Sequence, residues 1–143
     1  MTAAISPIPP MNTEVYMSTT DESIEQEIQA KGKTAARVTP ADIEAEIASE
    51  FYFTAADGVR GELLSSLPEL GVNFGGDNPL SLLTFCVLVL RNGFTVTGES
   101  ACASPENFDA EVGRKIARQS AVSRIWPLMG YELRSKLAGG AAA

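Results

Sequence analysis

Apolar and polar positions are most informative between residues 83 and 101, where an apolar run (LTFCVLVL) and an alternating run (FTVTGESA) flank Arg91-Asn92-Gly93. Asn-Gly between two such runs predicts a β-hairpin, because a two-residue type I′ turn needs positive φ at both central positions and these residues tolerate it. The first strand is apolar on both faces, which predicts burial of both. The second alternates, which predicts one face open to solvent or ligand.

A helix start follows the hairpin. Ser104 suits the N-cap and Pro105 the first helical position, with Glu106 and Asp109 in the first turn, so we expect the helix to begin at residue 105. The apolar residues that follow recur at three- and four-residue intervals and predict one core-facing stripe: Phe108, Val112, Ile116, Ala117 and Ala121. Trp126-Pro127 should end this helix, and residues 128–137 predict a second one.

The chain upstream of the hairpin contains weaker signals. Residues 19–32 and the segment opened by Thr39-Pro40 each predict a short helix. Phe51-Tyr52-Phe53 favours a strand, and Asp57-Gly58 favours a turn after it. Residues 61–81, rich in Gly, Pro, Ser and Asn, indicate a loop or a short helix.

These elements predict an α+β fold. A small antiparallel sheet, built on the hairpin around Asn92-Gly93, should pack against two C-terminal helices, with one or two short helices at the N-terminal side. At 143 residues the chain has room for one core. We expect a single domain over residues 19–137, a disordered segment over residues 1–18 and a flexible tail over residues 138–143.

Charge is unevenly distributed along the chain. The net charge is −7, which argues against nucleic-acid polymers and anionic membranes as partners. Residues 1–83 hold 4 basic and 13 acidic side chains, whereas residues 84–143 hold 7 basic and 5 acidic ones. The basic groups therefore lie with the hairpin and its helix. No run is long enough to span a bilayer and no secretory signal is evident, so we expect a cytoplasmic protein.

Catalytic residue types are scarce. The chain has no histidine, which removes the commonest general base and metal ligand, and we therefore expect neither an enzyme, a metal nor a cofactor. The two cysteines do not indicate a disulfide framework. A hydrolase would have to use Glu99 or Glu106, although the helix start already accounts for an acidic residue at position 106.

Two arginines on the predicted helix are candidates for anion binding. Arg114 and Arg118 are four residues apart, so their side chains stand one above the other and can grip two oxygens of a phosphate or diphosphate. The alternative is an ordinary solvated basic face.

Three stretches together resemble a known family: TPADIEAEIASEFYFTAADG, LRNGFTVTGESACASPENFDAEVGRKIA and RIWPLMGYEL. They are similar to small phage and prophage proteins that include the Thoeris anti-defence sponges of the first-described Tad type. The resemblance covers residues 19–137 and is most specific over residues 92–128. It implies a cytoplasmic protein of the infected bacterial host that binds glycocyclic ADP-ribose, made by TIR-domain enzymes, without degrading it. It also implies a homo-oligomer, from a dimer up to a hexamer, and in some members a site for cyclic di- or trinucleotides.

The resemblance also assigns roles to individual residues. The ring-stacking aromatic falls on Phe94, and the polar base or ribose contact on Asn107, with Asn92 as the other position. The phosphate-gripping arginines fall on Arg114, Arg118 and Arg124. Phe94 could equally be a core residue of the hairpin, and Asn107 could merely extend the helix cap.

Two further expectations follow from an oligomeric sponge. The cluster of Trp126, Met129 and Tyr131 is a candidate interface, because aromatic residues and Met are enriched there, although Trp126 could pack in the core instead. The alternative function is that of an acidic phage protein that inhibits a host protein by direct binding.

Overall fold

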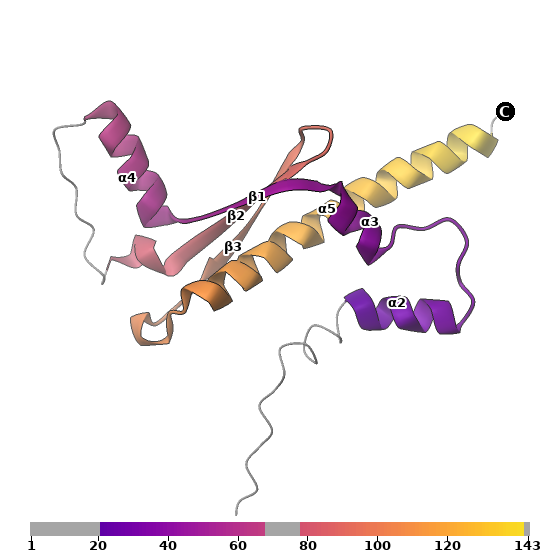
Figure 1. Cartoon of the computed structure of the whole chain (residues 1–143), viewed down its shortest axis with the longest axis horizontal. Helices are drawn as coiled ribbons and strands as arrows, with labels where there is room; N and C mark the ends of the chain where they lie inside the picture. The colour runs from indigo at the N-terminus through magenta and orange to yellow at the C-terminus, as the bar shows by residue number, and fades with distance from the viewer. Residues whose placement is uncertain (1–20, 68–77, 142–143) are drawn as a thin grey trace, which may run out of the picture.

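The computed structural model describes residues 21–67 and 78–141 (Figure 1). The predicted disordered segment over residues 1–18 and most of the predicted loop beyond residue 67 lie outside these ranges. In chain order the elements are α2 (Asp21–Ala30), α3 (Pro40–Glu46), β1 (Ile47–Thr54), α4 (Ala55–Ser66), the 3-10 turn η1 (Pro79–Leu82), β2 (Leu83–Leu90), β3 (Thr95–Ala101), the 3-10 turn η2 (Pro105–Asn107) and α5 (Ala110–Ala141).

The three strands form one antiparallel sheet in the order β1-β2-β3, and α5 crosses one of its faces (Figure 1). Tyr52 on β1 lies opposite Cys86 on β2, which in turn lies opposite Gly98 on β3. The α+β fold, the hairpin and the strand through Phe51-Tyr52-Phe53 are therefore confirmed.

The turn of the hairpin is not of type I′. Gly93 has a φ of 86°, but no residue other than glycine has positive φ in the described ranges, so Asn92 does not take the left-handed conformation. The backbone N–H of Leu90 donates to the carbonyl of Phe94 and that of Gly93 to the carbonyl of Leu90. Arg91 thus belongs to a three-residue loop that ends in a left-handed glycine, the next commonest hairpin connection.

Burial on β2 is one-sided, contrary to the two-sided burial that its sequence predicts. Alternate residues Thr84, Cys86, Leu88 and Leu90 are buried, whereas the residues between them are only partly buried. The reason is that α5 covers one face, while α4 packs at one end of the sheet. On the other face Phe51 remains 56 % exposed, and the Phe53 and Phe85 rings lie 5.7 Å apart. We call this surface the open face.

Small residues allow α5 to approach the sheet closely. A Cβ on Gly98 would lie 2.1 Å from the carbonyl oxygen of Ala117 and 2.3 Å from the backbone nitrogen of Ala121. The buried residues of α5 recur every fourth position: Gly113, Ala117, Ala121 and Ile125. Val112 and Ile116, which we expected in the core stripe, are exposed because this narrower stripe faces the sheet.

The helices differ from expectation in three places. Residues 105–107 form only a 3-10 turn, and α5 starts at Ala110, where Asp109 Oδ1 accepts from the Val112 N–H at 3.0 Å. Asp57-Gly58 is not a turn, because Thr54 and Asp57 form a capping box that starts α4. Pro127 lies inside α5, so the predicted pair of C-terminal helices is one helix of 32 residues.

Core contacts on both sides of Pro127 explain why α5 continues. Ile125 is fully buried and Met129 packs against the same core, so packing offsets the cost of an internal proline, about 3 kcal/mol. Beyond this point α5 projects past the sheet (Figure 1), and residues 130–140 are exposed except for the partly buried Leu133. The helix also runs through residues 138–141, where we expected a tail.

Candidate functional site

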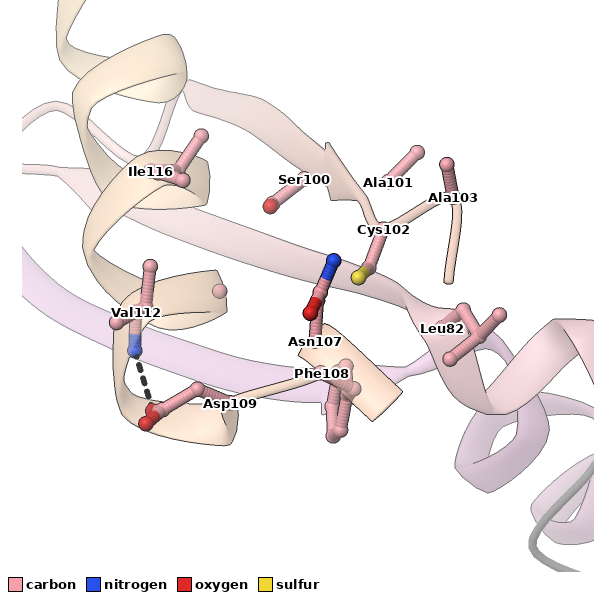
Figure 2. Close-up of a pocket in the computed structure, with 11 residues that line it drawn as sticks. Leu82, Ser100, Ala101, Cys102, Ala103, Asn107, Phe108, Asp109, Val112 and Ile116 are labelled. Carbon is pink, nitrogen blue, oxygen red and sulfur yellow. Dashed lines mark hydrogen bonds between the residues drawn. The ribbon is translucent and has the colours of Figure 1, made fainter. Parts of the chain in front are cut away.

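A hollow lies where β3 ends and α5 begins, and has a volume of about 270 Å³ (Figure 2). Its lining comes from η1, the end of β3, the loop after it and the first two turns of α5: Leu82, Ser100, Ala101, Cys102, Ala103, Asn107, Phe108, Asp109, Val112, Gly113 and Ile116. Ligand pockets generally span about 300–1,000 Å³, so this hollow suits part of a nucleotide-sized ligand. We call it the larger hollow.

The loop that shapes the larger hollow is fixed by its own hydrogen bonds. The Ser104 carbonyl accepts from the backbone N–H of Asn107 at 3.0 Å and lies 3.1 Å from the Cys102 thiol. The side chain of Asn107 projects toward Ser100 and Cys102 (Figure 2), and no hydrogen bond to it occurs in the residues that the structure describes. Asn107 does not cap α5, since Asp109 does so. Its amide is therefore available to a ligand.

A second, smaller hollow of about 40 Å³ lies on the other side of Phe108. Its lining comes from β1, α4, β2 and α5: Phe53, Thr54, Asp57, Thr84, Phe108, Ala110 and Arg114. Because Phe108 lines both hollows, one extended ligand could reach both. We call this one the smaller hollow.

Arg118 is bound by two carboxylates. Its guanidinium donates to Glu44 at 2.8 and 3.0 Å and to Glu50 at 2.8 Å. Hydrogen bonding to Glu44, followed by that to Glu50, raises the pKa of Arg118, and the same contact lowers the pKa of Glu44. Arg118 thus ties α5 to α3 and β1, and an anion there would have to displace these carboxylates.

Arg124 is also engaged within the protein. It donates to the Thr97 carbonyl at 2.7 Å and to the Thr97 hydroxyl at 3.1 Å, and it contacts Glu99 at 3.3 Å. Glu99, one of the two carboxylates considered for hydrolysis, is therefore part of an ion pair.

Arg114 has no such partner. No carboxylate lies within 4.0 Å of its guanidinium in residues 21–67 and 78–141, and the group lies 5.9 Å from the centroid of the Tyr52 ring. Such a contact is a cation–π interaction, which still leaves the N–H donors free. Arg114 lines the smaller hollow, so it is the predicted phosphate arginine that is available without rearrangement.

Phe94 and Asn92 lie at the opposite end of the hairpin from both hollows (Figure 1). Phe94 is 55 % exposed, so it is not a core residue, and Asn92 Oδ1 accepts from the Phe94 N–H at 2.9 Å. The eight residues of β2 separate the tip from the hollows by about 23 Å, at about 3.3 Å per residue. One chain therefore does not bring Phe94 together with Asn107 and Arg114.

Glu106, the other carboxylate considered for hydrolysis, has a lowered pKa. Glu106 accepts from the Ser104 hydroxyl at 2.8 Å, and hydrogen bonds from its own backbone N–H and from Ser104 lower its pKa. A general acid would need a raised pKa instead. Within the described ranges, no cluster of three or more His, Cys, Asp or Glu residues is placed to hold a metal ion.

Sequence reasoning predicted Arg114 but missed three polar residues of the smaller hollow: Thr54, Asp57 and Thr84. Thr54 and Asp57 carry a readable signal, since Thr-Ala-Ala-Asp has the spacing of a capping box. Thr84 carries none, because a threonine in an apolar strand has no distinguishing pattern. Phe108 was expected in the core stripe but separates the two hollows.

The protein is a small α+β domain with two hollows beside its long C-terminal helix. Its sequence also matches a family model. Residues 38–137 match the model of the phage protein (N4 Gp49/phage Sf6 gene 66) family. The match spans most of the chain, so the protein belongs to this family. Neither the curated proteins nor the solved structures contain a significant match. In the described ranges, no helix has both the length and the apolar character required to cross a membrane.

Proposed function

We propose that this phage-family protein is a non-catalytic sponge for a cyclic nucleotide-derived immune signal. The signal is glycocyclic ADP-ribose made by TIR-domain Thoeris enzymes, which the protein holds away from its effector in the cytoplasm of the infected bacterium. Cyclic di- and trinucleotides are the second ligand class to test. The resemblance over residues 92–128 supports this proposal, together with the two hollows beside α5.

The observation that carries the proposal is the guanidinium of Arg114, which has no carboxylate partner in the described ranges and lines the smaller hollow, next to the larger one that shares Phe108. A cyclic ADP-ribose needs a surface for adenine, donors for its diphosphate and polar groups for its ribose hydroxyls. The larger hollow with Asn107 offers the first, and Arg114 offers a donor. A sponge must compete with a receptor, which requires a nanomolar Kd, about −12 kcal/mol.

Isothermal titration with glycocyclic ADP-ribose tests this proposal directly. We expect Arg114→Gln to weaken binding by about 10- to 100-fold, or about 1.5–3 kcal/mol, because one charge-assisted hydrogen bond is lost. The matched control is Lys33→Gln, which removes the same charge from an exposed position between α2 and α3 and should leave the Kd unchanged.

The fate of the ligand separates a sponge from an enzyme. After heat denaturation of the complex, chromatography should recover the signal intact. Altered ligand would contradict sequestration, and an unchanged Kd for Arg114→Gln would place the site elsewhere.

The proposed sponge is a homo-oligomer. Asn92 and Phe94 lie at the opposite end of β2 from Asn107 and Arg114, so a single shared site needs a second copy to bring Phe94 to Asn107. Two apolar surfaces support association: the open face, and the projecting end of α5, where Tyr131 is 79 % exposed. Trp126 of the expected interface cluster is partly buried and donates to Asp21 at 3.0 Å. Light scattering of the pure protein should give a mass above 15.1 kDa, and a monomer would contradict a shared site.

The alternative function is inhibition of a host protein by direct binding, and helix α2 favours it. This helix carries four carboxylates and no basic side chain, and none of its residues is buried. It would then contact a basic surface. Protection of the phage should in that case survive Arg114→Gln and be lost when Glu22→Gln and Glu27→Gln are combined, whereas a sponge requires the reverse.

A further inference from the structure

The interior of the smaller hollow contains a hydroxyl group without a partner. Thr84 is only 4 % exposed and lines this hollow, yet no hydrogen bond to its hydroxyl is found in the parts of the chain that the structure describes. Among the described residues no fully buried side-chain nitrogen or oxygen lacks a partner, so this hydroxyl is reached from the hollow rather than sealed in the core. The Thr84 hydroxyl is therefore a group that a ligand can satisfy.

The opposite side of the smaller hollow is held rigid by the start of α4. The Thr54 hydroxyl accepts from the Asp57 N–H at 3.1 Å, and Asp57 Oδ2 accepts from the Thr54 N–H at 3.0 Å. These hydrogen bonds fix an ionised carboxylate and a hydroxyl against the hollow. They also lower the pKa of Asp57, and the hydrogen bond from the Thr54 backbone N–H has the largest effect. The carboxylate therefore stays charged at neutral pH.

The charges around the smaller hollow select a neutral group. Arg114 is positive and Asp57 negative, so a phosphate placed inside would gain from the first and be repelled by the second. An ammonium group would be attracted by Asp57 and repelled by Arg114. A hydroxyl group both donates and accepts, so a pair of hydroxyls can bond to Asp57, Thr84 and Arg114 together.

The size of the smaller hollow narrows the choice further. A water-sized group needs about 10–15 Å³ of such volume, so about 40 Å³ holds about three oxygen-sized groups. That is too small for a nucleobase and suits the hydroxyl edge of a sugar. The larger hollow on the other side of Phe108 has room for a base.

We propose that the smaller hollow binds the vicinal diol of a ribose, with Thr84 and Asp57 as its specificity-determining residues. The inference rests on the proposed function, in that the ribose belongs to the sequestered signal. The phosphate then lies outside the smaller hollow, on the outer side of Arg114.

Thr84→Val is the direct test, because it replaces the hydroxyl by a methyl group of the same shape. We expect the variant to be as thermally stable as the wild type and to bind glycocyclic ADP-ribose at least fivefold more weakly. Thr84→Ser, which keeps the hydroxyl, should restore most of the affinity. Thr95→Val on the opposite face of the sheet is the control and should change neither quantity.

A sugar fragment tests the smaller hollow without the signal. Methyl β-D-ribofuranoside, at the tens of millimolar that a fragment of this size needs, should shift the amide NMR signals of residues 54, 57 and 84. Its 2-deoxy analogue and the Thr84→Val protein should show no such shifts. The absence of shifts with the ribofuranoside would overturn the inference.

The two proposals fail separately. If the wild-type protein does not bind glycocyclic ADP-ribose, the sponge fails, while the fragment still decides the chemistry of the smaller hollow. If the signal binds equally well to the wild type and to Thr84→Val, the sponge stands and the diol site is wrong.

Discussion

At the scale of single residues, the contact between β3 and α5 depends on Gly98. A methyl group at this position would lie 2.1 Å from a backbone carbonyl oxygen, and a helix backbone cannot yield as a flexible side chain can. Ala117 and Ala121 are fully buried at the same contact. Any larger side chain at position 98 would therefore push α5 away from the sheet.

We predict that Gly98→Ala lowers the free energy of unfolding by about 3 kcal/mol or more, at or above the upper end of ordinary overpacking, because α5 must move away from the sheet. Urea denaturation measures the change. Gly130→Ala is the matched control, since in the described structure nothing lies within 4 Å of the added Cβ. This control should stabilise α5 by about 0.5–1 kcal/mol. Equal stability of Gly98→Ala and the wild type would show that the helix does not sit this close.

At the scale of elements, sequence patterns found the strands better than the helix ends. Asn92-Gly93 located the hairpin because glycine is required where φ is positive, and the aromatic run located β1. The start of α5 was missed because both Ser104 and Asp109 have cap-forming side chains, and Asp109 makes the cap. Pro127 was expected to end the helix, but tertiary packing of Ile125 and Met129 overrides the local preference.

The candidate site was only partly predictable for a related reason. Spacing along α5 placed Arg114 and Arg118 on one face, but the partners of Arg118 lie 68 and 74 residues away in sequence. No local pattern says that Glu44 and Glu50 bind Arg118 and leave Arg114 free. Asn107 was assigned through the family resemblance alone, whereas the environment of Thr84 depends on what packs over its strand.

The Arg118 contacts make the docking of α3 and β1 on α5 sensitive to acid. The pKa of Glu44 is lowered below its ordinary value of 4.5, so its contribution is complete above that value and is lost as the pH falls through the lowered one. We expect the wild type to lose up to about 1 kcal/mol of unfolding free energy from this pair as the pH falls below about 4.5, a modest amount because both side chains are partly solvated. Glu44→Gln should be less stable at neutral pH and show a shallower acid loss in urea titrations. Parallel pH profiles for the two proteins would contradict this role.

At the scale of the whole molecule, the fold is two layers deep with apolar surface left on one side. A chain with a net charge of −7 repels its own copies over most of its surface. The open face and the end of α5 are the exceptions, with exposed Phe51, Phe53, Leu128 and Tyr131. Association, where it occurs, should therefore involve these surfaces and strengthen with added salt, in contrast to binding of a phosphate-bearing signal at Arg114.

Hydrogen exchange along the projecting end of α5 should reveal whether the protein is assembled. An unsupported helical segment of about a dozen residues is marginal in water, so its amide hydrogens should exchange with deuterium within seconds when the chain is alone. The amides of residues 113–125, held against the sheet, should exchange only on global unfolding. If a second copy covers the end of α5, slow exchange should extend past residue 130 as the protein concentration rises. The first half of this helix would then report the stability of the fold, and its second half would report how much of the protein is bound to another copy.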